Sequence, residues 1–229
     1  MKKITIVLVS VVMFSHANAS SIGMNSVGFK LGSHELGIDT TVSGVNADVS
    51  GSAFAYEVSG NYNLLSPKGE QSFGIDASLR YMASSDMSID GDDAEITYFE
   101  GGLRPYLSIS DFILFGDLGF SYVELEVTSG GVSASVSETA FAPGFGFQVN
   151  SEKFNVRPTL HWVEYNDDDT VISTLDEFVF LTIPVSYNYS DTIDVSFSYR
   201  HAFGVELTVG TTTQEVYTNE YTIGLDYKF

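Results

Sequence analysis

The sequence contains no cysteine in its 229 residues, so it has no disulfide framework, no cysteine metal site and no lipoprotein attachment point. Basic residues are scarce: 10 Lys and Arg stand against 30 Asp and Glu, for a formal net charge of −20. This balance argues against a nucleic-acid partner, because a phosphate backbone needs Lys and Arg to neutralise it. Runs of 18 apolar residues are also missing, which excludes membrane-spanning helices.

The segment 1–19 has the features of a secretory signal peptide. Lys2 and Lys3 form a positive start, an apolar run follows, and Ala17-Asn18-Ala19 supplies the small residues of a cleavage site. The apolar run is too short to cross a bilayer as a helix, which disfavours an uncleaved anchor. We predict cleavage after Ala19 and a single mature domain at residues 20–229.

Apolar and polar residues alternate in stretches that recur about every 20 residues. In residues 73–82 (FGIDASLRYM), for example, apolar side chains occupy the odd positions and mostly polar ones the even positions. Side chains of a β-strand point to opposite faces in turn, so each stretch predicts a strand with one apolar and one polar face. Prolines within these stretches predict local bulges, at Pro105, Pro143, Pro158 and Pro184.

The predicted connections alternate between tight and long. The tight turns are residues 66–69, 108–111, 150–153 and 189–192. The long loops lie near residues 34–52, 84–95, 125–138, 165–176 and 206–219. Together they predict ten strands with both termini on the tight-turn side. An eight-strand barrel is the alternative, in which the weakest strand, around Val27–Leu31, is lost.

Charge separates a membrane barrel from a soluble β-sandwich. The polar phase contains six basic and six acidic residues, namely Lys30, Arg80, Arg104, Arg157, Arg200, Lys228, Glu57, Asp76, Glu100, Asp117, Asp194 and Asp226. A dry sandwich core would pay a large desolvation cost for so many ions. In a membrane barrel the apolar phase faces lipid and the polar phase faces the lumen. We therefore predict an all-β, closed antiparallel transmembrane β-barrel with short periplasmic turns and long acidic extracellular loops.

Aromatic residues of the apolar phase gather near the tight turns and the C-terminus. They are Tyr62, Phe73, Phe112, Phe147, Phe154, Tyr187 and Tyr227. Such a group predicts an aromatic belt at one membrane interface. Trp162 is in phase with Phe154 and is predicted to reach the opposite interface.

The segments GLRPYL, PGFGFQV, LTIPVSYNY and above all the C-terminal YTIGLDYKF resemble the OmpA/OmpX-like superfamily of small bacterial outer-membrane β-barrels. In that family an aromatic C-terminal residue, preceded by apolar residues at alternate positions, is the signal read by the outer-membrane insertion machinery. The resemblance assigns this signal to Tyr221, Ile223, Leu225, Tyr227 and Phe229. It also implies an integral outer-membrane protein with both termini in the periplasm.

Three histidines after the predicted signal peptide are the candidates for catalysis. His161 falls in the polar phase with Arg157, where it can act as a base or belong to the lumen charge network. His201 falls in the apolar phase near the outer rim, and His34 lies where the first long loop is predicted to begin. Their surroundings, LHWVE and RHAFG, do not match the His and Ser motif of related lipases and lipid A deacylases. We therefore predict that the protein is not an enzyme.

The predicted long loops are acidic, most densely at DGDDAE (residues 90–95) and NDDDT (residues 166–170). Hard cations such as Ca²⁺ and Mg²⁺ prefer oxygen ligands of this type. Neither cluster has EF-hand spacing, so we predict weak divalent-cation binding at most, no defined metal site and no cofactor. A solvated acidic surface is the alternative.

Barrels near eight strands are filled by side chains, whereas wide aqueous pores need 16–18 strands. Ten strands with balanced inward charges therefore predict a lumen largely plugged by ion pairs. We predict a monomeric structural and surface-interaction scaffold that contacts outer-membrane lipid and lipopolysaccharide and, through its loops, a host cell or phage. A narrow cation-preferring channel is the alternative, and an enzyme at the loop rim is less favoured.

Overall fold

The computed structural model describes residues 22–42, 45–66, 71–89, 92–129, 131–165, 178–209 and 212–229. The predicted signal peptide and the acidic cluster at 167–169 lie outside the described residues. No helix in the described part of the chain is long and apolar enough to cross a membrane.

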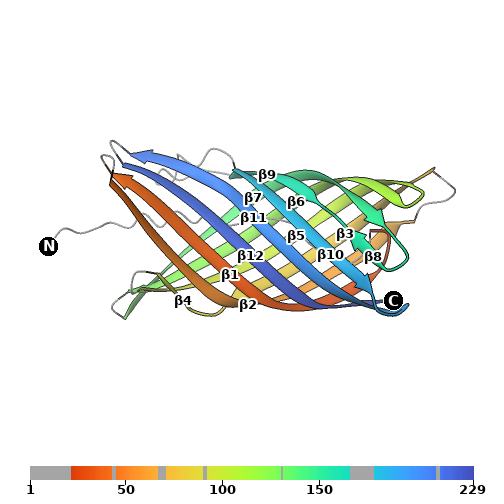
Figure 1. The fold of residues 1–229 in the computed structure, drawn as a ribbon, viewed down its shortest axis with the longest axis horizontal. Helices are drawn as coiled ribbons and strands as arrows, with labels where there is room; N and C mark the ends of the chain where they lie inside the picture. The colour runs from red at the N-terminus through yellow and green to blue at the C-terminus, as the bar shows by residue number, and fades with distance from the viewer. Residues whose placement is uncertain are drawn as a thin grey trace.

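The described residues form one antiparallel sheet that closes on itself (Figure 1). Its strands are β1 (Ser26–Val42), β2 (Val45–Leu65), β3 (Gln71–Ser84), β4 (Met87–Ile89), β5 (Asp92–Ile109), β6 (Phe112–Ser129), β7 (Val132–Asn150), β8 (Phe154–Val156), β9 (Thr159–Tyr165), β10 (Phe178–Asn188), β11 (Ile193–Val209) and β12 (Thr212–Lys228). The first strand pairs with the last, β12, and with β2 along its whole length. The strong tilt of the strands against the long axis is typical of barrels.

Ten barrel strands result, although twelve strand segments are present. β8 and β9 are two parts of one barrel strand, because both lie between β7 and β10. β4 pairs only with β5, outside the barrel order. The predicted closed ten-strand barrel is therefore confirmed, and the eight-strand alternative is wrong. The weakest predicted strand, around Val27–Leu31, is part of β1, which is stabilised because it hydrogen-bonds to β12 on one edge and to β2 on the other.

The prolines disturb the barrel less than predicted. The interruption between β8 and β9 falls at Arg157 and Pro158, where Pro158 cannot donate to the ladder. Pairing keeps a constant register past Pro105, Pro143 and Pro184, so the bulges predicted there are wrong. Register shifts occur instead between Asn63 and Leu65 and between Ala202 and Val205.

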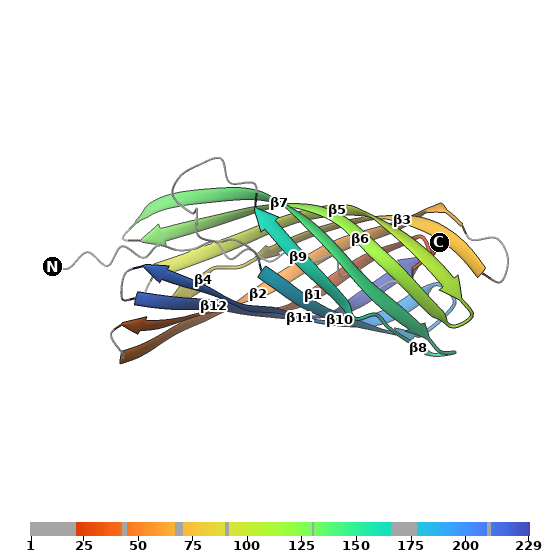
Figure 2. The same cartoon turned by 90° about the horizontal axis from the view of Figure 1, so that it is seen from above.

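The strands also run further than predicted at the end opposite the tight turns. Three predicted long loops, near 34–52, 125–138 and 206–219, are mostly hairpin, formed by β1–β2, β6–β7 and β11–β12. These hairpins project at the end away from the C-terminus (Figures 1 and 2). In these hairpins polar residues occur on both faces, so the sequence does not alternate with period two. The backbone hydrogen bonds of the ladder still form, because they do not depend on whether the side chains face water or lipid.

The barrel has its apolar face outside and its polar face inside. Ile223 and Phe29 are 61% and 53% exposed on the outer surface, whereas Lys30, Glu57 and Asp76 are fully buried inside. A soluble protein shows the reverse distribution. The outer surface is therefore suited to lipid and the lumen to polar contacts.

Candidate functional site

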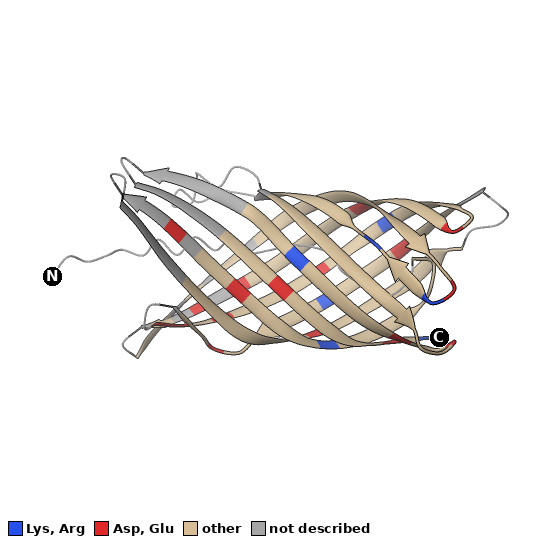
Figure 3. Ribbon diagram, in the orientation of Figure 1, with Lys and Arg blue, Asp and Glu red and all other residues tan. Residues whose placement is uncertain are grey.

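The lumen contains the residues predicted for its charge network. All thirteen lie inside the barrel and none is more than 8% exposed: Lys30, Glu57, Asp76, Arg80, Glu100, Arg104, Asp117, Arg157, His161, Asp194, Arg200, Asp226 and Lys228. The described basic residues lie in the middle of the barrel and toward its C-terminal end (Figure 3). No group of three or more His, Asp or Glu in the described part of the chain is arranged to hold a metal ion.

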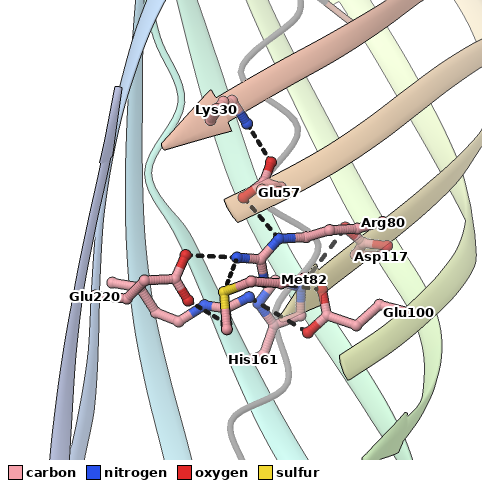
Figure 4. A network of polar contacts seen from close by, with 9 residues as sticks. Lys30, Glu57, Arg80, Met82, Glu100, Asp117, His161 and Glu220 are labelled. Carbon is pink, nitrogen blue, oxygen red and sulfur yellow. Dashed lines mark hydrogen bonds and ion pairs between the residues drawn. The ribbon is translucent and has the colours of Figure 1, made fainter. Parts of the chain in front are cut away.

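Six of the charged side chains form one connected group, which we call the crossing layer: Lys30, Glu57, Arg80, Glu100, Arg200 and Glu220 (Figure 4). Arg80 donates from Nε to Glu57 at 2.9 Å, from Nη1 to Glu100 at 3.2 Å and from Nη2 to Glu220 at 2.5 Å. Lys30 donates to the other oxygen of Glu57.

The crossing layer joins opposite walls of the barrel. Arg200 on β11 donates to Glu220 at 2.9 Å and to Glu100 on β5 at 3.3 Å. Four barrel strands separate β5 from β11 in either direction around the barrel, so this pair spans the lumen. Three basic and three acidic groups balance, and each buried charge has an oppositely charged partner, which is the condition under which buried ions are tolerated.

A second group of charges lies nearer the tight turns. Arg104 donates to Asp117 from Nη2 at 2.7 Å and from Nε at 3.2 Å, and its guanidinium lies over the Phe115 ring, 5.4 Å from the centroid. His161 Nε2 lies 3.5 Å from the same carboxylate. Lys228 donates to Asp194 at 2.7 Å. The Arg104 and Lys228 bonds connect neighbouring strands, so they brace the wall without crossing the lumen.

One glycine is required by this arrangement. A Cβ on Gly144 would lie 2.3 Å from a ring carbon of His161 and 2.7 Å from the backbone oxygen of Leu160. The absence of a side chain therefore makes room for the imidazole beside Asp117. This agrees with the general use of strand glycines where a neighbour approaches closely.

The chain before β1 lies across the tight-turn mouth of the lumen. Ile22 N–H donates to Gln148 at 3.1 Å, and Gly23 N–H donates to Asp76 at 2.8 Å. Ile22 also packs in a buried apolar cluster with Tyr106 and Phe115. Gly23 has a φ of +85°, a conformation that favours glycine. These contacts hold Ile22 and Gly23 against the inner wall at the tight-turn end of the barrel.

The prediction that His34 lies at the start of a long loop is wrong, and the predicted charge network left out Glu220. Glu220 lies between Arg80 and Arg200, and His34 is fully buried and stacked on Tyr98 with a centroid distance of 5.8 Å. Both residues are in the polar phase of their strands: Glu220 is in phase with Asp226, and His34 with Lys30. The alternation therefore indicated that both residues point inward, but the predicted strands were too short for this to be used.

The predicted aromatic and insertion-signal residues lie on the outer surface. Near the tight turns, Phe112 stacks on Phe147 at 5.7 Å and Phe154 packs against Tyr187 at 5.0 Å. Trp162 stacks on Phe145 at 5.4 Å. The remaining members are exposed: Tyr62, Phe73, Tyr221, Ile223, Leu225, Tyr227 and Phe229. The last strand is paired on both edges, with β1 and β11.

Acidic side chains of the hairpin end lie close to one another. Glu95, near the start of β5, faces Glu126 across the β5–β6 ladder. A hydrogen bond with Asp86, together with these neighbouring carboxylates, raises the pKa of Glu95 above its usual value. Carboxylates that lie close together repel one another when ionised, which favours the protonated form of Glu95.

The geometry defines an integral β-barrel with a lipid-facing outer surface. The family model of the outer membrane protein beta-barrel domain matches residues 4–159, more than half of the chain. The chain therefore belongs to this family, whose members are integral proteins of the bacterial outer membrane. None of the curated protein sequences matches the chain.

The chain is similar to several solved structures. The outer membrane protease OmpT of Escherichia coli is similar over 94% of this chain and 100% of its own, with 11% identity and a TM-score of 0.58. Neisserial surface protein A covers 88% and 97%, with 13% identity and a TM-score of 0.40. Ail, the attachment invasion locus protein of Yersinia pestis, covers 90% and 99%, with 15% identity and a TM-score of 0.37. At 11% identity, the similarity to OmpT shows the fold alone.

Proposed function

We propose that the protein is a closed scaffold of the outer membrane that presents acidic hairpins on the cell surface. The main support is the ion pair between Arg200 and Glu100, which spans the lumen, together with the three carboxylates held by Arg80. A small ion would have to break several buried ion pairs to pass this layer. The segment at Ile22–Gly23 adds a second obstruction.

In this proposal the tight turns and both termini face the periplasm, and the last strand, β12, together with Phe229 directly after it, directs insertion by the outer-membrane machinery. The hairpins at the other end contact lipopolysaccharide, a host cell or phage. Because the hairpins and lipopolysaccharide phosphates are both negative, these contacts need bridging divalent cations, held weakly by carboxylate oxygens. The barrel acts as a monomer and needs no cofactor.

A non-catalytic role is part of the proposal. His34 and His161 are fully buried within the barrel, out of reach of a macromolecular substrate. His201 lies on the outer surface, where Nδ1 is 2.9 Å from the side-chain oxygen of Asn219. General-base catalysis needs a histidine within hydrogen-bond reach of a substrate and its nucleophile.

A narrow cation-preferring channel is the second candidate. The observation that favours it is that the inward residues which the structure describes include seven acidic groups against six basic ones, because Glu220 joins the six predicted acidic groups. A negative lumen attracts cations when water can pass.

Single-channel conductance of the refolded protein in a planar bilayer tests the proposal. Folding is first verified by heat modifiability on a gel. We expect a silent wild type and a silent Lys153→Ala control, whose lysine is exposed in a tight turn. The double variant Arg80→Ala/Arg200→Ala should give conductance steps. Steady cation-preferring steps from the wild type would replace the scaffold with the channel.

A further inference from the structure

A polar row interrupts the apolar outer surface of the barrel toward the hairpin end. The strands β11, β12, β1 and β2 lie side by side there (Figure 1). One outward residue of each strand pairs directly with the next across the ladders, and we call these four the rim row: His201, Asn219, Glu35 and Ser52. Closer to the tight turns the outward residues of the same strands are mostly apolar. A charge on the lipid face is costly at the midplane and cheap at the interface, so Glu35 marks where the lipid-facing surface ends.

The side chain of Asn219 fixes the geometry of the rim row. Its Nδ2 donates to Glu35 Oε2 at 3.3 Å, and its Oδ1 accepts from the Tyr199 hydroxyl at 3.3 Å. The same Oδ1 lies 2.9 Å from His201 Nδ1, which therefore acts as the donor. In the neutral imidazole this leaves Nε2 as an acceptor. Neither that nitrogen nor Glu35 Oε1 has a hydrogen-bond partner among the residues that the structure describes.

Aromatic rings flank the rim row on both sides. On the tight-turn side Tyr221, 45% exposed, packs against Tyr199 with 5.1 Å between the ring centroids. On the hairpin side Phe203, 46% exposed, packs edge to face with His201 at 5.0 Å. The register shift of the β11–β12 ladder falls at Phe203, and such irregularities redirect side chains beside functional sites. The two open acceptors thus lie on a surface bordered by exposed rings.

The spacing of the two acceptors selects the kind of ligand. His201 and Glu35 lie on strands that β12 separates, and neighbouring strands are about 4.8 Å apart, so these two strands are roughly 10 Å apart. A single ammonium group cannot reach both acceptors, and a phosphate is repelled by the Glu35 carboxylate. Two linked sugar rings have this span. Their hydroxyls can donate to both acceptors, and their apolar faces can pack on aromatic rings.

We propose that the rim row and its flanking rings bind the uncharged disaccharide head group of a glycolipid in the adjacent membrane leaflet. The acyl chains of this lipid lie against the apolar outer surface below, at Phe197 and Ile223. This contact needs no bridging cation, unlike the contacts of the acidic hairpins. The site goes beyond the scaffold role, because it depends on the lipid-facing wall and not on the closed lumen.

Native mass spectrometry of the refolded barrel tests the site. Heat-modifiable protein is mixed with micelles that contain equal amounts of digalactosyldiacylglycerol, phosphatidylethanolamine and phosphatidylcholine with the same acyl chains. We expect the wild type to retain the galactolipid in preference to both phospholipids. His201→Leu/Glu35→Leu should lower this preference about tenfold, an effect typical of two lost hydrogen bonds. The matched control Thr97→Leu/Glu124→Leu removes a paired outward hydroxyl and carboxylate from β5 and β6 and should bind as the wild type does.

A second variant keeps the test decisive if the first does not fold. His201→Phe preserves an aromatic ring and should lower the preference about fivefold, the usual effect of one lost hydrogen bond. Equal preference in the rim-row variant and the control would overturn the proposal. So would a wild type without preference, or one that prefers phosphatidylethanolamine, which would mean that Glu35 binds an ammonium group. Conductance plays no part in this measurement, so its failure leaves the scaffold role untouched.

Discussion

Replacement of Arg80 by methionine should strongly destabilise the barrel. Methionine keeps the apolar stem but removes a guanidinium that bonds to Glu57, Glu100 and Glu220. Lys30 and Arg200 would then face three buried carboxylates, leaving one negative charge without compensation. Removal of one partner from a buried ion pair costs about 3–5 kcal/mol. That is a large part of the roughly 5–15 kcal/mol by which folded proteins are stable.

The free energy of unfolding can be measured by urea titration in lipid vesicles, with Trp162 as the reporter. Trp162 is the only tryptophan in the chain and lies on the lipid-facing surface, so its fluorescence changes when the barrel leaves the bilayer. Arg80→Met/Glu220→Gln restores the charge balance and should recover more than half of the loss. Lys153→Met, in a tight turn, should stay within about 0.5 kcal/mol of wild type. A decrease in the free energy of unfolding of less than about 1 kcal/mol for Arg80→Met would refute the reasoning, because removal of one partner from a buried ion pair should cost more than that.

Three further predictions concern other parts of the molecule. Arg104→Ala leaves Asp117 without its guanidinium partner and should cost about 3 kcal/mol in the same titration, and Arg104→Ala/Asp117→Asn should cost less; equal losses would contradict the pairing. Gly144→Ala should cost about 1–3 kcal/mol because the new Cβ meets His161 and the Leu160 backbone, whereas Gly60→Ala, which has no side-chain contact within 4 Å, is the control. Glu95 follows directly on the short hairpin that β4 forms with the start of β5. The raised pKa of Glu95 means that this folded hairpin binds the proton more tightly than the unfolded chain, so its stability should fall as pH rises from the usual carboxyl pKa through the raised one. Hydrogen exchange of the hairpin should show this dependence in the wild type and lose it in Glu95→Gln; a dependence unchanged by the substitution would assign it to other groups.

The sequence by itself determined the class of protein, a membrane β-barrel, and which face of each strand points into the lumen. Period-two alternation is a local property of a strand, so it can be read without knowing any neighbour. It placed Arg80, Arg104, Arg157 and Arg200 inside the barrel, and the structure has all four in the lumen. The number of strands followed in the same way, from the turns between alternating stretches.

Only the tertiary structure decided which inward side chains share a level. Arg200 and Glu100 are 100 positions apart in the chain, and they meet because the stagger between tilted strands brings β5 and β11 to the same height on opposite walls. The same stagger brings His34 on β1 to the ring of Tyr98 on β5, although β2 and β3 lie between these strands in the sheet. Alternation shows which face of its strand a residue occupies. Register is a relation between strands, so it is fixed only when all ten strands close into one barrel.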